Sequence, residues 1–212
     1  MIKKILIEGS NYCGKTTITN ILKYQIPGAT ALEFHDFYHQ HILKQSDKII
    51  QLTTKDDFEN IDKQELDKAE KYLKSRNKFV LEYLKRIKHD NTIIERSFLT
   101  QMVYRNLLFK IEEHSGLFEI EKLFAMENVK LILITATSEA ILERMNNDNP
   151  KIILRSAESI PFHLKDPKIL IKKNELYNFY FNQLQFINKY RIDTTGKTPE
   201  ALSEFIKHVL ES

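Results

Sequence analysis

The chain has little of what stabilises secreted or membrane-embedded proteins. It contains a single cysteine, Cys13, among 212 residues, which excludes an internal disulfide framework and is typical of a reducing compartment. No stretch approaches the roughly 20 consecutive apolar residues of a membrane span, and the apolar-rich run in MIKKILIEG is too short for the core of a signal peptide. We therefore expect a cytoplasmic protein that does not associate with membranes.

The chain also lacks an excess of charge of either sign. Its 32 lysines and arginines nearly balance 29 aspartates and glutamates, for a formal net charge of +3. Because no arginine-rich stripe is visible, a general nucleic-acid binder is disfavoured. Hydrophobic residues make up 42% of the chain and aromatic residues 10%, which is typical of a globular protein. The length fits one domain over residues 1–212.

Short apolar runs alternate with longer amphipathic segments. The predicted strands are residues 3–8, 29–34, 91–95, 129–135 and 189–193. Several are runs of isoleucine and leucine, as expected of strands covered on both faces in a parallel sheet. The predicted helices are residues 15–25, 59–87, 99–111, 138–145, 167–186 and 199–210. This alternation predicts an α/β fold with a five-stranded parallel sheet flanked by helices.

Two helix starts and one irregular segment stand out in the second half. Asp166-Pro167 and Thr198-Pro199 each predict an N-cap followed by proline at the first helical position. Residues 146–165 are polar and contain Pro150 and Pro161. We expect them to be the least regular part of the chain, a mobile lid within the single domain.

The stretch IEGSNYCGKTT, residues 7–17, has the spacing of a phosphate-binding loop. Gly9, Gly14, Lys15 and Thr16 fit G-x-x-x-x-G-K-[ST], with an apolar strand before and a helix after. Backbone N–H groups and the helix N-terminus would surround phosphate oxygens. The predicted nucleotide-binding residues here are Gly9, Asn11, Tyr12, Cys13, Gly14, Lys15, Thr16 and Thr17. Lys15 would reach the β- and γ-phosphates of ATP, and the Thr16 hydroxyl would bind Mg²⁺.

A GTPase is disfavoured because the base-reading motif N-K-x-D is absent. Asn77-Lys78 is followed by Phe-Val, and Asn188-Lys189 by Tyr-Arg. One D-x-x-G occurs, at residues 193–196, but it follows the last predicted strand rather than lying in the middle of the chain.

The third predicted strand ends on Glu95-Arg96-Ser97. A carboxylate at this point can hold the hydration shell of Mg²⁺, because ligands of open α/β sheets bind beyond the carboxyl ends of the strands. Arg96 offers a planar, permanently charged group for a phosphate. The alternative is an exposed Glu–Arg pair at a strand end, which the preceding phosphate loop disfavours.

Three stretches together resemble the deoxynucleoside kinase and thymidylate kinase superfamily: EGSNYCGKTT, IIERSFLTQMVY and YRIDTTGKTPEAL. The resemblance implies the P-loop NTPase fold and an ATP- and Mg²⁺-dependent phosphotransferase. It also implies that Thr195, Gly196 and Lys197 pack against the adenine of ATP. The E-R-S stretch is more similar to nucleoside kinases, and the C-terminal stretch to thymidylate kinases, so the two families are not separated.

The acceptor side is less clearly marked. In nucleoside kinases a carboxylate after the second strand takes the proton of the 5′-hydroxyl, and Glu33 matches that position best. Asp36 is the rival, because DFY resembles the uridine kinase group. Thymidylate kinases need an arginine for the acceptor phosphate here, and residues 31–50 contain none. Other expected acceptor contacts are Phe34, Phe37, Tyr38, Arg96, Gln101 and Tyr104, although the aromatic residues could equally belong to the core.

Two further arginines are expected to act on the transferring phosphoryl group. Arg144 precedes the irregular segment and Arg155 lies within it, where small kinases close a lid over ATP. Zinc at His35, His39 and His41 is disfavoured, because no cysteine or further histidine lies close by in the sequence.

Together with the resemblance, these motifs predict a thymidylate-kinase-like enzyme that transfers the γ-phosphoryl group of ATP to a deoxynucleoside monophosphate. Lys15, Glu33, Asp36, Arg96, Arg144 and Arg155 are its predicted catalytic residues, and Thr16 and Glu95 its Mg²⁺ ligands. A deoxynucleoside 5′-kinase is the first alternative, and a nucleotide-binding regulator or ATPase that transfers nothing is the second. The resemblance also implies a possible homodimer.

Overall fold

The computed structural model of the chain describes residues 3–33, 63–87, 91–109, 116–153 and 166–212. Five strands form one sheet in the order β2-β3-β1-β4-β5, and every pair is parallel. Their bounds are Lys4–Glu8 for β1, Thr30–Glu33 for β2, Thr92–Glu95 for β3, Val129–Thr135 for β4 and Asn188–Asp193 for β5. The five-stranded parallel sheet predicted from the sequence is confirmed.

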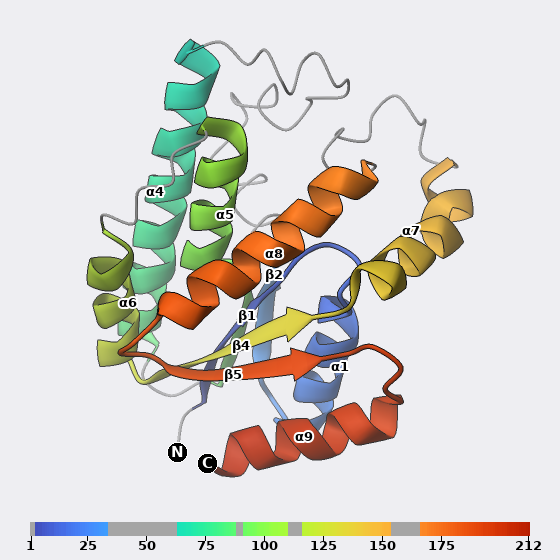
Figure 1. Ribbon diagram of the computed structural model, residues 1–212. Helices are drawn as coiled ribbons and strands as arrows, with labels where there is room; N and C mark the ends of the chain where they lie inside the picture. The colour runs from blue at the N-terminus through green and yellow to red at the C-terminus, as the bar shows by residue number, and fades with distance from the viewer. Residues whose placement is uncertain (1–2, 34–62, 88–90, 110–115, 154–165) are drawn as a thin grey trace.

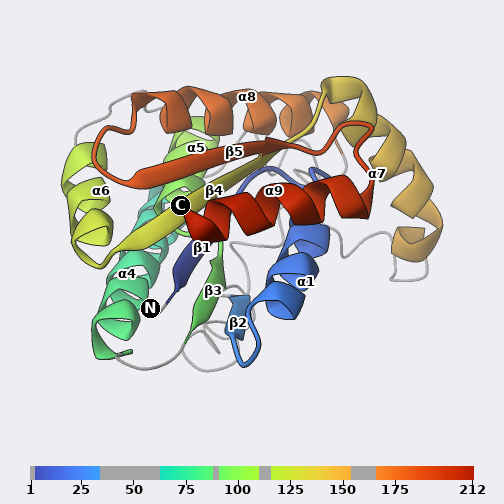
Figure 2. The ribbon, with the colours of Figure 1, turned by 90° about the horizontal axis from the view of Figure 1, so that it is seen from below.

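Helices cover both faces of this sheet (Figure 1 and Figure 2). One face is covered by α4 (Lys63–Arg86), α5 (Phe98–Phe109), α6 (Leu117–Met126) and α8 (Pro167–Gln183). The other is covered by α1 (Lys15–Gln25) and α9 (Pro199–Glu211), which pack on each other. A further helix, α7 (Ser138–Ile153), follows β4.

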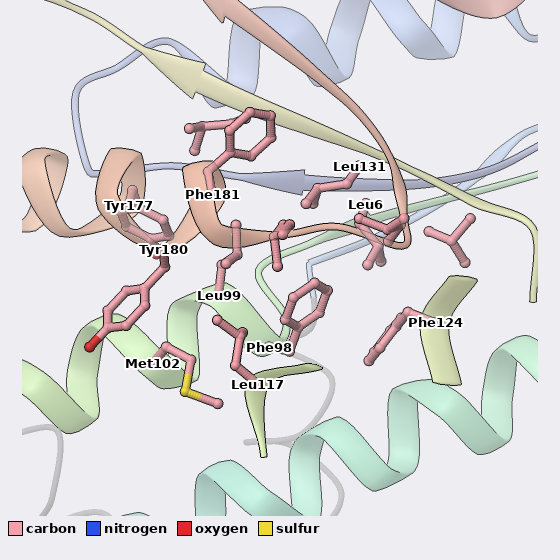
Figure 3. Packing of buried hydrophobic residues seen from close by; sticks show 14 of the residues in the cluster. Leu6, Phe98, Leu99, Met102, Leu117, Phe124, Leu131, Tyr177, Tyr180 and Phe181 are labelled. Atoms are coloured by element: carbon pink, nitrogen blue, oxygen red, sulfur yellow. The ribbon is translucent and has the colours of Figure 1, made fainter. Parts of the chain in front are cut away.

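The continuous apolar strands divide their side chains between two cores. In β1, Leu6 joins the core under α5 and α8, whereas Ile5 and Ile7 join the core under α1 and α9. Successive strand residues point to opposite faces, so a strand covered on both faces needs an unbroken apolar run. Figure 3 shows the first core, in which Phe98 and Phe124 pack with ring centroids 5.0 Å apart.

Both predicted proline-containing helix starts are confirmed. The Asp166 side chain accepts a hydrogen bond from the backbone N–H of Ile169 at 3.0 Å, and α8 begins at Pro167. The Thr198 hydroxyl accepts one from the N–H of Ala201 at 3.3 Å, and α9 begins at Pro199. Each cap satisfies an N–H group that the first helical turn leaves without a backbone partner.

The structure corrects the expected helices in three places. Helix α6 was not predicted, and α7 continues through Pro150 to Ile153, where the sequence favoured an irregular segment. A proline removes one hydrogen bond and bends a helix without always ending it. Helix α8 ends at Gln183 instead of residue 186.

The early end of α8 has a specific cause. Oε1 of Glu121, a buried residue of α6, accepts hydrogen bonds from the backbone N–H groups of Gln185, Phe186 and Ile187 at 2.7, 2.6 and 3.0 Å. These donors would otherwise continue the helix, so a residue more than sixty positions away determines where the chain turns toward β5. Among the helices that the structure describes, none is long and apolar enough to cross a membrane.

Candidate active site

The loop between β1 and α1 has a conformation that depends on glycine. Gly9 has φ +146°, and a Cβ there would lie 2.3 Å from the carbonyl oxygen of Ile134 in β4. Gly14 has φ +93° and precedes the first residue of α1. Since glycine has no side chain, Gly14 leaves the first N–H groups of α1 without a side-chain cap, which suits an anion site at a helix N-terminus.

Lys15 is the first residue of α1, and its side chain is only 7% exposed. Its ammonium group donates hydrogen bonds to the carbonyl oxygens of Gly9 at 3.1 Å and Ser10 at 2.5 Å. Burial lowers the pKa of Lys15 to about 8, although Cys13 and Glu95 act in the opposite direction. The loop therefore surrounds the Lys15 ammonium, and a bound phosphate would stabilise its charged form.

The other loop residues fall into two groups. Thr16 and Thr17 are exposed in the first turn of α1. The Cys13 side chain is buried, and its thiol donates to the carbonyl oxygen of Ser10 at 2.8 Å. Cys13 can therefore reach a nucleotide only through its backbone, whereas the Thr16 hydroxyl is available to one.

Glu95 ends β3 and is 6% exposed. In the sheet it pairs with Ile7 of β1 on one side and with Glu33 of β2 on the other. The hydroxyl of Thr19, in α1, donates a hydrogen bond to Oε1 of Glu95. The predicted carboxylate therefore lies at the same sheet edge as the phosphate loop and is oriented by α1.

Glu95 and Thr16 fit the needs of Mg²⁺ in a phosphate site. This ion is usually held by one or two carboxylates together with waters and substrate phosphates, rather than by a cage of protein ligands. Over the described ranges, no group of three or more histidine, cysteine, aspartate or glutamate side chains could hold a metal ion by itself. The three histidines considered for zinc lie outside those ranges.

Arg96 follows Glu95 in a left-handed conformation, with φ 66°. Its backbone N–H donates to the carbonyl oxygen of Ile7 at 2.8 Å. The next turn is held by Glu8, whose two carboxylate oxygens accept from the Ser97 N–H and the Thr100 hydroxyl, each at 2.6 Å. A left-handed non-glycine residue costs roughly 1 kcal/mol or more, and these bonds over-determine it.

Two buried charged residues beside the loop, Glu8 and Lys173, were not predicted from the sequence. Glu8 is fully buried beside the first loop glycine. Lys173, in α8, is 0% exposed, and its ammonium donates to Asn11 Oδ1 at 2.8 Å and to the Tyr104 hydroxyl at 3.3 Å. It also lies 5.0 Å from the centroid of the Tyr104 ring. The available signal was a lysine on an apolar helix face, three residues after Leu170 and three before Leu176.

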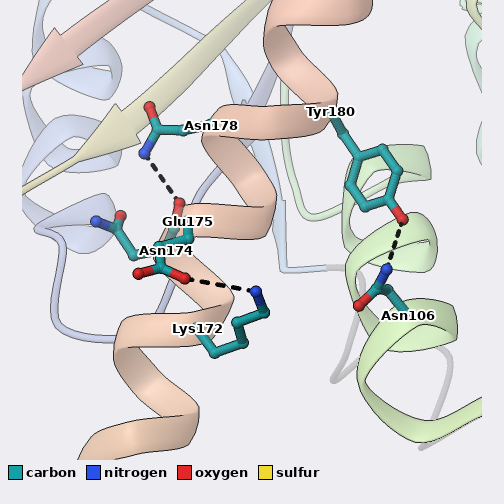
Figure 4. A network of polar contacts seen from close by, with 6 residues as sticks. All are labelled: Asn106, Lys172, Asn174, Glu175, Asn178 and Tyr180. Atoms are coloured by element: carbon teal, nitrogen blue, oxygen red, sulfur yellow. Dashed lines mark hydrogen bonds and ion pairs between the residues drawn. The ribbon is translucent and has the colours of Figure 1, made fainter. Parts of the chain in front are cut away.

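Helix α8 is fastened to its surroundings by further polar contacts. The Ser10 hydroxyl, in the phosphate loop, donates to the carbonyl oxygen of Leu170 at 3.3 Å. Asn174 Nδ2 donates to the carbonyl oxygen of Ala136 at 2.9 Å, just beyond β4. Asn106 in α5 donates to the Tyr180 hydroxyl at 3.3 Å (Figure 4). These bonds hold α8 against the loop, β4 and α5 at once.

Arg144, in α7, lies between the phosphate loop and the segment after β5. Its guanidinium donates to the carbonyl oxygen of Tyr12 at 3.0 Å and to the hydroxyl and carbonyl oxygens of Thr194 at 2.9 and 3.0 Å. The Thr195 hydroxyl accepts from the Thr137 N–H at 2.8 Å. The structure thus brings Arg144 and Thr195 together beside the loop, and Gly196 and Lys197 follow them in an exposed turn.

Two of the residues predicted to contact the acceptor, Gln101 and Tyr104, lie on α5. Gln101 is 2% exposed, and its Oε1 accepts a hydrogen bond from Nδ2 of Asn77, which is 3% exposed. Asn77 Oδ1 has no hydrogen-bond partner within the described part of the chain. Glu33 is described only by its backbone, at the end of β2. Several predicted site residues lie outside the described ranges: Phe34, Asp36, Phe37, Tyr38 and Arg155.

Solved structures of similar fold were found, although no protein-family model and no curated protein matches the chain. A deoxyadenosine kinase from M. mycoides with bound dATP is 16% identical, with a TM-score of 0.60, over 99% of this chain and 100% of that one. A thymidylate kinase from Candida albicans is 14% identical, with a TM-score of 0.61, over 99% and 91%. A shikimate kinase from Acinetobacter baumannii is 14% identical, with a TM-score of 0.50, over 100% and 94%. The chain has the fold that P-loop nucleoside and nucleotide kinases share.

Proposed function

We propose that the protein is an ATP- and Mg²⁺-dependent kinase that transfers the γ-phosphoryl group to a deoxynucleoside monophosphate. The observation that carries this proposal is the cluster of Lys15, Arg96 and Glu95 around a loop whose conformation requires Gly9. Two cations and one carboxylate at the end of a parallel sheet suit a polyphosphate and its metal ion. The fold shared with nucleoside and nucleotide kinases supports the same activity.

Each residue has a role that follows from its position. The N–H groups at the start of α1 bind the phosphates of ATP, and the Lys15 ammonium leaves its two carbonyl partners to bind phosphate oxygens. Arg96 stabilises the charge that develops on the transferring group. Thr16 and Glu95 would hold Mg²⁺, which supplies positive charge to the phosphate oxygens when bound. The reaction then depends on positioning and electrostatics more than on covalent chemistry by the protein.

Arg144 is proposed to act on the donor side. Its hydrogen bonds to Tyr12 and Thr194 join the phosphate loop to the segment that carries Thr195, Gly196 and Lys197. That segment is where the adenine of ATP is expected. In this arrangement Arg144 fixes the wall of the adenine site, and reaches the transferring phosphoryl group only if these bonds break.

The acceptor base is proposed to meet the amides of Asn77 and Gln101. Buried amides are almost always fully hydrogen-bonded, and among the described residues Asn77 Oδ1 has no partner, so a further donor is needed to offset the cost of burying it. An amide oxygen accepts from an N–H group, which the edge of a nucleobase offers. This pair therefore suits a nucleobase-containing acceptor.

A deoxynucleoside 5′-kinase is the second candidate, and one observation favours it. Glu33 and Glu95 pair in register on adjacent strands, so two acidic residues end at the same sheet edge. One carboxylate could hold Mg²⁺ while the other accepts the proton of a 5′-hydroxyl. A monophosphate acceptor needs no such base, because its phosphate is already nucleophilic.

The deciding experiment incubates the protein with Mg·ATP and a panel of nucleosides and nucleoside monophosphates. Products are resolved by anion-exchange chromatography. A monophosphate converted to a diphosphate supports the main proposal, and a nucleoside converted to a monophosphate supports the second. ADP formed without any phosphorylated acceptor contradicts both and favours the ATPase alternative. Lys15→Met should abolish turnover, while Lys23→Met, at an exposed position of the same helix, should not.

A further inference from the structure

Lys173 is a charged side chain with no exposed surface. Removing an ammonium ion from water costs several kcal/mol unless a counter-charge compensates it. Within the described residues, however, both hydrogen-bond acceptors of its Nζ are neutral: the Asn11 amide oxygen at 2.8 Å and the Tyr104 hydroxyl at 3.3 Å. The Tyr104 ring, 5.0 Å away, adds only a weak attraction. The ammonium is therefore buried without full compensation.

Two other cations, Arg96 and Lys15, interact electrostatically with Lys173. Burial lowers the pKa of Lys173, and the nearby charge of Arg96 lowers it further. Arg96 and Lys173 also lower the pKa of Lys15. Three positive groups thus converge from α1, α8 and the turn after β3, although like charges repel most strongly where water is excluded. A bound anion would reduce the repulsion among these three cations and stabilise the site.

The nearby carboxylates already have partners of their own. Glu8 accepts from the Ser97 N–H and the Thr100 hydroxyl, and Glu95 accepts from the Thr19 hydroxyl. These bonds orient both carboxylates toward groups other than Lys173. A ligand anion is therefore better placed than either residue to balance the third cation.

The position of Lys173 indicates which anion this would be. One of its contacts, Asn11, belongs to the phosphate loop, and the other, Tyr104, lies one turn beyond Gln101 on α5. Lys173 is thus located between the donor phosphates and the proposed acceptor base. Residues 31–50, where the resemblance to thymidylate kinases implies an arginine for the acceptor phosphate, contain none.

We propose that Lys173 and the Tyr104 hydroxyl form the binding site for the phosphate of the acceptor nucleoside monophosphate. The inference rests on the proposed kinase function and names the group that recognises its acceptor. On binding, the ammonium exchanges the neutral Asn11 oxygen for a phosphate oxygen, which gives a charge-assisted hydrogen bond. The Tyr104 hydroxyl donates to a second phosphate oxygen.

The test measures binding rather than turnover. Isothermal titration calorimetry is run with ATP and with dTMP, dAMP, dGMP and dCMP separately, on wild type, Lys173→Met and Lys172→Met. Lys172 is the matched control, an exposed neighbour on the same helix that pairs with Glu175 at 3.6 Å (Figure 4). We expect Lys173→Met to weaken binding of the best-bound monophosphate at least 30-fold and binding of ATP less than threefold. Lys172→Met should change neither by more than twofold.

Two further measurements separate binding from folding. Lys173→Met should raise the melting temperature of the ligand-free protein, because it removes a buried cation while keeping the length of the side chain. Tyr104→Phe keeps the aromatic ring and leaves the charge of Lys173 in place. It should weaken monophosphate binding three- to tenfold. If Lys173→Met lowers the affinities for ATP and for the monophosphate equally, the inference is overturned, since the lysine then acts through Asn11 on the donor site. Unchanged monophosphate affinity in both variants would overturn it as well.

The outcomes distinguish this inference from the proposed function. If wild type binds a monophosphate through Lys173 but phosphorylates nothing, the binding site stands and the kinase proposal fails. If wild type phosphorylates only nucleosides, and Lys173→Met does so equally well, the inference fails while a kinase remains.

Discussion

The hydroxyl of Thr19, in the second turn of α1, donates a hydrogen bond to the carboxylate of Glu95 at the end of β3. The two residues are 76 positions apart in sequence. Their contact ties the helix that follows the phosphate loop to the strand that supplies the proposed Mg²⁺ ligand. The orientation of this carboxylate is therefore set by the same helix that positions Lys15.

Removing the Thr19 hydroxyl should raise the Mg²⁺ concentration that turnover requires without weakening nucleotide binding. In Thr19→Val the shape is kept but Glu95 loses its donor. We expect the Mg²⁺ concentration for half-maximal ATP turnover to rise about tenfold, as for other residues that orient metal ligands. Affinity for ATP in EDTA should stay within twofold. Thr30→Val, at an exposed position of β2, is the control, and an identical Mg²⁺ dependence in the two variants would contradict the role of Thr19.

Gly9→Ala should disrupt the phosphate loop. Its Cβ would meet the Ile134 carbonyl oxygen at 2.3 Å and Cys13 Sγ at 2.9 Å, so a backbone segment must move. We expect unfolding to become easier by about 2–3 kcal/mol and ATP affinity to fall at least about tenfold, measured by chemical denaturation and calorimetry. Gly28→Ala is the comparison, because its φ is +76° but nothing lies within 4 Å of the added carbon. It should cost only about 1 kcal/mol and leave ATP binding intact; equal effects would contradict the steric argument.

ATP binding should take up a proton at alkaline pH. Burial lowers the pKa of Lys15 to about 8 in the free protein, so its ammonium loses its proton as the pH rises through that value. Bound phosphates favour the charged form, hence affinity should fall up to about tenfold per pH unit above 8. Calorimetry at pH 7 and 9, in buffers of different ionisation enthalpy, measures the uptake. Lys15→Met should show a smaller change, and equal uptake by wild type at both pH values would refute the assignment.

The same lowered pKa affects folding with a defined sign. Between about 8 and the ordinary value of 10.5, the unfolded lysine holds a proton that the folded one has lost. Stability of the ligand-free protein therefore gains from Lys15 as the pH rises through this window. Denaturation of wild type and Lys15→Met at pH 7 and 9.5 should show a larger gain for wild type, and equal gains would contradict it.

Glu121→Gln should destabilise the protein while leaving ligand binding unchanged. Oε1 of Glu121 accepts three backbone N–H groups where the chain turns from α8 to β5, and a neutral amide oxygen is a weaker acceptor. We expect a loss of about 2 kcal/mol, which is about 4–8 °C in melting temperature for a chain of this size. Glu119→Gln, at an exposed position of the same helix, should shift it by less than about 1 °C. A similar melting temperature for both variants would show that the three bonds contribute little.

The features that could be predicted from the sequence are those determined by residues close together in the chain. The strands follow from apolar runs, and two helix starts from an N-cap and a proline. The phosphate loop follows from the spacing of Gly9, Gly14 and Lys15. The placement of Glu95 beside that loop also followed, because parallel strands end at one edge.

What could not be predicted depends on contacts between distant segments. Lys173 and Glu8 acquire their positions beside the phosphate loop only when α8 and α5 pack on the sheet, and Asn77 appears in the sequence merely as part of an incomplete N-K-x-D motif. Glu121 ends α8 from another helix. The assignments of Glu33 or Asp36 as a base, of Arg155 in a lid and of a homodimer stay predictions.

The phosphate loop is held in place by residues from the far end of the chain. Ser10 contacts Leu170 and Asn11 contacts Lys173, at separations of 160 and 162 positions, and Thr194 donates to the carbonyl oxygen of Cys13 across 181. The glycine-rich motif is therefore synthesised well before the segments that hold it, and the loop is completed only after Thr194 has been made and has packed against it. Non-local contacts of this kind form slowly, so nucleotide affinity should return late in refolding and indicate that α8 and the segment after β5 have packed against the phosphate loop.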